Sequence, residues 1–154
     1  MIPVTSRSSQ HLAVFGLGGS GRAAARALLA GGATVTAWDD NAESRAEAAN
    51  ENIPLVDLTT ADWTDITALV LSPGIPLTHP QPHKVVDCAR DAGRPVIGDI
   101  ELLVENNDGA ALIGITGTNG KSTTSALIHH VLKTAGVAVQ IGGNFGPPVL
   151  GLES

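Results

Sequence analysis

The stretch HLAVFGLGGSG at residues 11–21 decides the fold of this chain. An apolar run enters a turn with glycine at positions 16, 18 and 21, and the alanine- and leucine-rich segment 22–30 then predicts a helix. Segment 33–38 carries β-branched residues and predicts a second strand. This order is typical of a parallel sheet with helices on both faces, so we expect an α/β fold with a Rossmann-like sheet domain.

The alternation of strands and helices continues along the chain. Helices are expected over 42–50, 84–92 and 99–105, the last capped by Asp99, and strands over 53–56, 68–71 and 95–97, with a proline-rich loop at 73–82. A second unit then repeats the order, with strands expected at 111–115 and 137–141, a glycine loop at 117–120 and a helix at 121–135.

These elements divide the chain into four parts. We predict a polar N-terminal tail at 1–10, a Rossmann-like domain at 11–105, a linker at 106–110, and the beginning of a P-loop-type α/β domain at 111–154. The last part has too little chain to bury a sheet of its own. The sequence is therefore predicted to be a fragment of something longer.

The first glycine turn has the spacing of a diphosphate-binding turn. Gly16, Gly18 and Gly21 fit G-x-G-x-x-G, which permits a tight turn, close approach of a phosphate and packing of helix on strand. Asp39, at the end of the second strand, can accept hydrogen bonds from ribose hydroxyls. The same spacing also occurs in plain tight turns, and Asp39 could equally be a solvated turn residue or a cap. An NAD-dependent oxidoreductase is one alternative function, although no hydride-transfer motif follows.

The second glycine loop has the chemistry of a phosphate loop. Residues 114–123 read GITGTNGKST, in which successive amides can wrap a polyphosphate, Lys121 can neutralise its terminal oxygens, and the hydroxyl of Ser122 or Thr123 can ligate Mg²⁺. Ile115 stands where the general pattern G-x-x-x-x-G-K-[ST] has glycine. An ordinary capped helix is the alternative interpretation. The histidines at 79, 83, 129 and 130 show no metal-ligand spacing.

Composition argues against several classes of partner. The net charge of -6 with only three lysines, and an aromatic content of 3%, leave neither a basic stripe nor a stacking platform for nucleic acid. Cys88 is single, so no intramolecular disulfide forms. No apolar run approaches the roughly 18 residues of a membrane span. We expect a cytoplasmic protein without a membrane partner, with a monomer favoured.

Five motifs in order resemble the Mur ligases. They are GLGGSG at 16–21, SPGIP followed by His79 and Pro80 at 72–80, GDIEL at 98–102, GTNGKST at 117–123 and GGNFGP at 142–147. The family's form of the fourth motif accounts for Ile115. Phe145 departs from the fifth, where an aliphatic residue is more usual. The resemblance runs from about His11 to the end of the chain, and within the family it is strongest for the D-glutamate-adding enzymes.

The resemblance implies two nucleotide sites. The UDP-sugar would contact Gly19, Ser20, Asp39, Asp40, Asn41, Ser72, Pro73, Gly74 and Asn144, with Gly19 and Ser20 at the diphosphate and residues 39–41 beside the uridine. ATP would contact Gly117, Thr118, Asn119, Gly120, Lys121, Ser122 and Thr123, with Mg²⁺ on Ser122 and Lys121 as the candidate catalytic residue.

The resemblance also implies a reaction. It is the ATP-driven addition of D-glutamate to UDP-N-acetylmuramoyl-L-alanine through an acyl phosphate, in peptidoglycan synthesis. The family's acidic metal ligands, its modified lysine and its glutamate-binding domain would all follow Ser154, so we expect this fragment alone to be inactive. A stand-alone nucleotide-binding module is a second alternative function.

Overall fold

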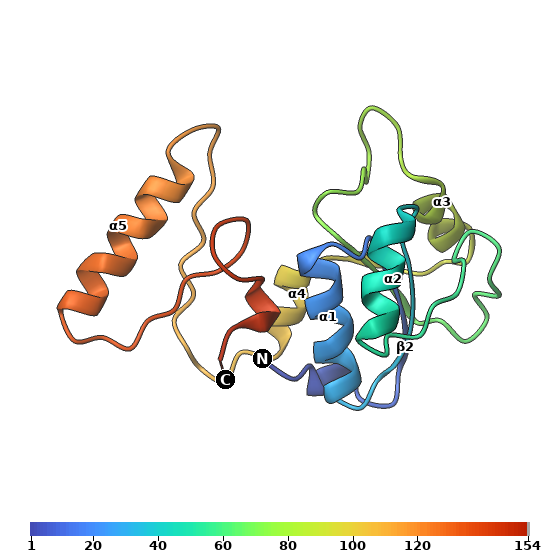
Figure 1. The fold of residues 1–154 in the computed structure, drawn as a ribbon, viewed down its shortest axis with the longest axis horizontal. Helices are drawn as coiled ribbons and strands as arrows, with labels where there is room; N and C mark the ends of the chain where they lie inside the picture. The colour runs from blue at the N-terminus through green and yellow to red at the C-terminus, as the bar shows by residue number, and fades with distance from the viewer. Residues whose placement is uncertain (154) are drawn as a thin grey trace.

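The computed structural model of the chain describes residues 1–153. Its elements are η1 (Thr5–Arg7), β1 (His11–Phe15), α1 (Gly19–Ala30), β2 (Thr34–Trp38), α2 (Ala42–Asn50), β3 (Ala68–Leu71), α3 (Lys84–Asp91), β4 (Val96–Ile97), α4 (Asp99–Glu105), α5 (Lys121–Thr134) and η2 (Val149–Gly151). Figure 1 shows the sheet and its helices on one side and α5 on an arm that extends away from them.

The sheet has four parallel strands in the order β2-β1-β3-β4. His11 pairs with Thr34 and Phe15 with Trp38 across β1 and β2. All four residues of β3 are buried, as expected for a central parallel strand covered on both faces. The α/β fold with a parallel sheet is therefore confirmed.

The core lies on both faces of the sheet. Successive side chains of a strand point to opposite faces, so Leu12 and Val14 join one buried cluster while Ala13 and Phe15 join the other. The first cluster contains α1 residues with Leu102 of α4 and Leu150 of η2, and the second contains Val85 and Val86 of α3 with the segment 58–66.

Residues 1–10 pack against the sheet domain. Val4 is fully buried, and its amide donates to the carbonyl of Ala27 at 2.9 Å. A Cβ added at Gly31 would lie 2.1 Å from the Val4 carbonyl oxygen, so this contact requires glycine there. The Ile2 amide donates to the carbonyl of Leu150 at 3.0 Å, which places η2 beside the first residues of the chain (Figure 1).

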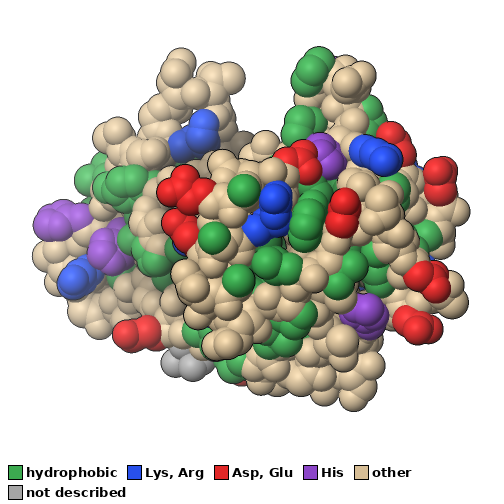
Figure 2. Space-filling model, turned by 45° about the vertical axis from the view of Figure 1, so that its right-hand side comes forward, with side chains coloured by type: hydrophobic (Ala, Val, Ile, Leu, Met, Phe, Trp, Pro, Cys, Tyr) green, Lys and Arg blue, Asp and Glu red, His purple; other side chains and the backbone are tan. Residues whose placement is uncertain are grey.

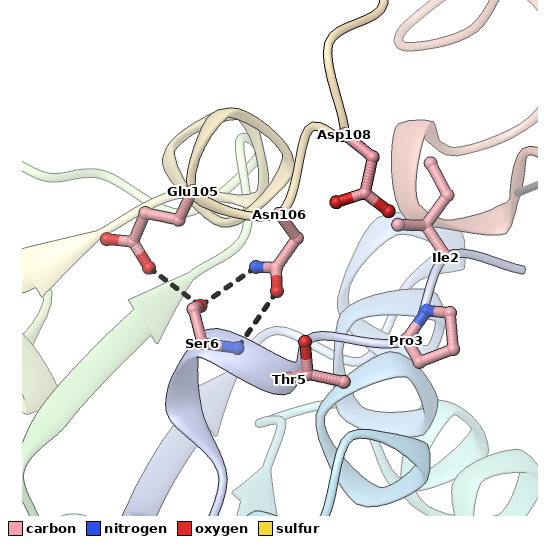
Figure 3. Close-up of a pocket in the computed structure, with 7 residues that line it drawn as sticks. All are labelled: Ile2, Pro3, Thr5, Ser6, Glu105, Asn106 and Asp108. Carbon is pink, nitrogen blue, oxygen red and sulfur yellow. Dashed lines mark hydrogen bonds between the residues drawn. The ribbon is translucent and has the colours of Figure 1, made fainter.

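The N-terminal segment also holds the end of α4. The Ser6 amide donates to Asn106 Oδ1 at 3.0 Å, and Asn106 Nδ2 donates to Ser6 Oγ at 2.9 Å. Figure 3 shows this contact in a pocket between the first residues of the chain and residues 105–108. Arg7 Nη2 and Nε lie 2.6 and 2.9 Å from the two carboxylate oxygens of Glu105.

We expect Arg7→Ala to lower the free energy of unfolding by about 0.5–1 kcal/mol at pH 7, the range for a partly exposed ion pair. The hydrogen bond from Arg7 holds the pKa of Glu105 below its ordinary value of 4.5. The pair therefore stabilises the fold above that value, and its contribution is lost as the pH falls through the lowered pKa. Urea unfolding in a series from pH 7 down to pH 2 measures the loss of stability and its disappearance in acid. Arg90→Ala, at an exposed pair of 3.8 Å, is the control, and an Arg7→Ala loss that does not shrink anywhere in the series would show that packing, not charge, is responsible.

Several local expectations from the sequence are wrong. The strands expected at 111–115 and 137–141 do not form, because within residues 1–153 neither segment finds a neighbouring strand, and one helix cannot cover a two-stranded sheet. The start of a P-loop-type sheet is thus not seen. Gly98 caps α4, with its amide donating to Glu101, and Asp99 is the first helical residue. Segment 53–56 makes only an isolated bridge, between Leu55 and Ala37.

None of the helices over residues 1–153 is long and apolar enough to cross a bilayer. The cytoplasmic location expected from the sequence stays a prediction.

Candidate functional site

The first glycine turn is built by close backbone contacts at the end of β1. The Gly16 amide donates to the carbonyl of Trp38 at 2.9 Å, and Gly16 has a positive φ of 90°. Ser72 Oγ donates to the Gly16 carbonyl at 2.6 Å. A Cβ added at Gly21 would lie 1.7 Å from that same oxygen. The turn is therefore fixed by glycine at 16 and 21 and by the hydroxyl of Ser72.

The front of this turn carries backbone amides without acceptors. Among the residues that the structure describes, the amides of 18–21 donate to no backbone or side-chain oxygen. They belong to the first turn of α1, where a helix has no internal acceptor to offer. A Cβ at Gly18 would meet nothing within 4 Å, and one at Gly19 would meet only Pro148 Cγ, at 3.8 Å, so the start of the turn is open beside Gly18. A helix N-terminus with free amides and open space can bind a phosphate.

Asp39 fastens this turn to the turn after β2. Its Oδ2 accepts from the Leu17 amide at 2.5 Å, and its Oδ1 accepts from the Asn41 amide at 2.8 Å. Each carboxylate oxygen has two lone pairs, so each retains one for a ligand hydroxyl. The carboxylate thus has a structural role beside the ligand role expected from the sequence.

The turn after β2 is further ordered by side chains of α2. Asn41 Oδ1 caps α2 by accepting from the amides of Glu43 and Ser44 at 2.8 and 3.2 Å. Arg45 Nη1 donates to the carbonyls of Asp39 and Asp40 at 2.7 and 2.9 Å, and its guanidinium lies 4.6 Å from the centre of the Trp38 ring. The sequence interpretation missed Arg45, although its place one turn into α2 brings it back over residues 39 and 40.

The loop after β3 lies beside the same edge of the sheet. Ser72 is engaged by Gly16, whereas Pro73 and Gly74 are exposed, and nothing lies within 4 Å of a Cβ at Gly74. The loop ends at His83, whose Nε2 lies 3.0 Å from Asp40 Oδ2. The sequence interpretation also missed the role of His83. The only feature of the sequence that could have indicated it is the position of His83 as a helix cap after a proline-rich loop.

The segment after α5 returns to this edge. Pro148 Cγ would lie 3.8 Å from a Cβ at Gly19, and Val149 and Leu150 are buried against α1 and α4. The exposed Asn144 is in the loop that leads to Pro148. The structure therefore gathers the first turn, the turn after β2, the loop after β3 and the 142–148 segment at one edge of the sheet.

The second glycine loop stands apart on the arm. Gly117 and Gly120 have positive φ values of 143° and 76°, and Gly120 is the N-cap of α5. The amides of 117–120 have no acceptor within residues 1–153, while Lys121 Nζ donates to the Gly117 carbonyl. Ser122 and Thr123 are exposed in the first helical turn, and α5 buries none of its residues. The loops at 73–82 and 115–120 form the two upper projections in Figure 2, with a hollow between them.

Asp99, the first residue of α4, is a buried carboxyl near this edge of the sheet. It is 8% exposed, and burial raises the pKa of its carboxyl, as does the charge of Glu101, while the backbone amides of Asp99 and Ile100 oppose the rise. No group of three or more His, Cys, Asp or Glu side chains able to hold a metal ion occurs in the part of the chain that the structure describes.

The comparisons with known proteins agree with this arrangement. Residues 10–98 match the model of the family described as Mur ligase MurD-like, N-terminal domain. The chain is 57% identical to the UDP-N-acetylmuramoylalanine--D-glutamate ligase of Rhizobium etli, over 99% of this chain and 33% of that protein. It is 54% identical to the proteins of the same name from Brucella abortus and from Caulobacter sp., over 99% of this chain and 34% of each.

The chain thus spans about a third of the length of these relatives. Among solved structures, shikimate dehydrogenase from Aquifex aeolicus superposes with a TM-score of 0.50 and 17% identity, over 65% of this chain and 46% of that chain. At this identity the likeness shows the fold alone. The family match covers more than half of the residues and confirms the resemblance seen in the sequence. The chain belongs to the Mur ligase family, in its MurD-like group.

Proposed function

We propose that this chain is the uridine-nucleotide-binding part of a ligase that adds D-glutamate to UDP-N-acetylmuramoyl-L-alanine in peptidoglycan synthesis. One observation carries the proposal: among the described residues the amides of 18–21 have no acceptor at a helix N-terminus that is open beside Gly18, in a chain 57% identical to a ligase of that name. The proposed domains are the sheet domain at 11–105, the linker at 106–110 and the first part of an ATP-binding domain from 111 onward.

In the proposed UDP-sugar site, the diphosphate binds the amides of Gly19 and Ser20. The nucleoside lies by Asp39, Asp40 and Asn41, and the remaining contacts come from Ser72, Pro73, Gly74 and Asn144. Two observations support this placement. The carboxylate of Asp40 is exposed, and Asp39 retains lone pairs beside the turn. Ser72 acts through Gly16, so its role in this site is to hold the turn in shape.

In the proposed ATP site, the phosphates bind the loop from Gly117 to Thr123. The residues fit this ligand, because the amides of 117–120 are unpaired and nothing lies within 4 Å of a Cβ at Gly120. Lys121 now donates to a loop carbonyl and would exchange that bond for phosphate oxygens. Mg²⁺ would be held with the hydroxyl of Ser122 and would neutralise phosphate charge when bound.

The proposed chemistry forms an amide in two transfers. A carboxylate oxygen of the alanyl group bonds to the γ-phosphorus of ATP while the bond to ADP breaks, which gives an acyl phosphate. The amine of D-glutamate then bonds to the acyl carbon, phosphate leaves, and the nitrogen loses a proton. Within this chain, Lys121 stabilises the charge on the transferred phosphoryl group, and the amides fix both nucleotides. We propose that residues 1–154 bind nucleotide without completing this reaction.

Calorimetric titration of this chain with UDP, uridine and NAD tests the proposal. We expect UDP to bind at least about tenfold more tightly than uridine, because the charge-assisted bonds to the diphosphate contribute more than 1.4 kcal/mol. Equal affinity for UDP and uridine would show that the diphosphate does not bind to the first turn. Binding of NAD without binding of UDP would support the oxidoreductase alternative and overturn the proposal.

A further inference from the structure

His83 makes three contacts where the loop after β3 meets α3. Its Nε2 lies 3.0 Å from Asp40 Oδ2, and its Nδ1 lies 3.2 Å from the Val85 amide. Its ring lies 4.4 Å from the ring of Phe15, centre to centre. The His83 side chain is 21% exposed, whereas that of Asp40 is 70% exposed. A partly buried, fixed imidazole thus holds an exposed carboxylate.

The contacts of His83 fix its tautomer. The Val85 amide is a donor, so Nδ1 must be the unprotonated acceptor that caps α3. Nε2 then carries the hydrogen and donates it to Asp40. Each ring nitrogen therefore has a separate partner. One stabilises the helix, and the other orients the carboxylate.

The bond to Asp40 joins two loops that follow different strands. Asp40 lies in the turn after β2, and His83 ends the loop after β3, which is also closed by the His83 amide donating to the Pro76 carbonyl at 3.0 Å. Phe15, at the end of β1, packs against the ring. The carboxyl edge of the sheet is where ligands bind in open parallel sheets. His83 therefore sets the spacing of two loops at that edge.

We infer that His83 is a positioning residue for the nucleoside end of the UDP-sugar: its Nε2–H holds one oxygen of Asp40 so that the other faces the ligand as an acceptor. The inference rests on the proposed function. A carboxylate has no donor, so it selects N–H and O–H groups of the nucleoside. Without His83, Asp40 would sample other rotamers and would have to be ordered when the ligand binds, which lowers affinity.

Two substitutions separate the capping role from the positioning role. Asparagine can accept from the Val85 amide at the position of Nδ1 and is a good helix cap, but it is too short to reach Asp40. Glutamine places its amide nitrogen about where Nε2 lies and can donate to Asp40, but it is a poorer cap. We therefore compare His83→Asn with His83→Gln, and add Asp40→Asn alone and in combination with His83→Asn.

Calorimetry with UDP and thermal unfolding by circular dichroism are measured on all variants of this chain. His83→Asn should keep the melting temperature and weaken UDP binding by about two- to tenfold, the cost of ordering one freed side chain when the ligand binds. His83→Gln should keep the UDP affinity and lower the melting temperature by a few degrees. In the Asp40→Asn background, His83→Asn should cause no further loss of affinity.

The outcomes distinguish this inference from the proposed function. If the unsubstituted chain binds UDP and His83→Asn binds it equally well, the positioning role is wrong and the proposed function stands. If affinity falls in proportion to melting temperature across the variants, His83 is only a cap, and the inference fails. If the unsubstituted chain binds no UDP at all, the proposed function fails, and the inference fails with it.

Discussion

Replacing Gly21 with alanine should destabilise the chain by about 3 kcal/mol or more, at the upper end of the range for overpacked sites. The new Cβ would lie 1.7 Å from the Gly16 carbonyl oxygen and 2.6 Å from Ser72 Oγ. The Gly16 carbonyl oxygen is a backbone atom of the turn after β1, so it cannot rotate away as a side chain could. α1 would have to move off the sheet, which exposes the buried cluster that contains Leu28. Urea unfolding followed by circular dichroism measures the loss.

Gly18→Ala is the matched control in the same turn. Gly18 has φ −65° and ψ −172°, which alanine also adopts, and its Cβ would meet no atom within 4 Å. We expect a change in unfolding free energy of no more than about 0.5 kcal/mol, as at an unconstrained surface position. A Gly21→Ala chain that unfolds at the same urea concentration as the parent would mean that the turn is wider than the structure shows.

Replacing Lys121 with alanine should reduce the rate of the proposed ligation by roughly 10³-fold, the loss typical of removing one group that stabilises transition-state charge. The measurement is ATP-dependent addition of D-glutamate by the full-length ligase, because this chain covers only a third of the relatives' length. Lys121 is in the first turn of α5, beside the unpaired amides of the second loop. Lys121 carries the positive charge of that loop, and its flexible side chain can stabilise the phosphoryl group as it is transferred.

Lys133→Ala is the control for Lys121→Ala. Lys133 is a lysine of the same helix, in its last turn and away from the loop, so its loss should leave the rate within about twofold, which corresponds to about 0.4 kcal/mol. Because α5 buries no residue, neither substitution should change the unfolding free energy of this chain by more than about 0.5 kcal/mol. If the Lys121→Ala ligase retained a tenth of the rate, the proposed role of Lys121 in stabilising the transferred phosphoryl group would be wrong.

The sheet domain could be predicted from sequence because its signals are local. Apolar runs, β-branched residues and glycine turns place β1 and β2 within one residue of their observed bounds and α1 within three. The parallel order then follows from the alternation of strand and helix. The first glycine turn was predicted for the same reason, since its geometry depends on the spacing of three glycines.

The remainder depends on contacts between distant residues, which no local pattern reports. The strands expected at 111–115 and 137–141 have the right composition but no neighbours to pair with among residues 1–153. His83 reaches Asp40 across 43 positions of the sequence, through a loop whose path no motif predicts. Asp39 accepts hydrogen bonds from the Leu17 and Asn41 amides. Its place in the sequence could not show whether it binds the protein backbone, a ligand or both.

The packing of Leu150 beside Ile2 has a consequence for biosynthesis. Leu150 is 1% exposed in the same cluster as Leu28 and Leu102, so the face formed by α1 and α4 is incomplete without it. On the ribosome, α1 and α4 emerge before this residue has been translated. The nascent sheet therefore carries an uncovered apolar face until the arm with α5 has also been made, and its final closure is delayed by the time needed to translate that arm.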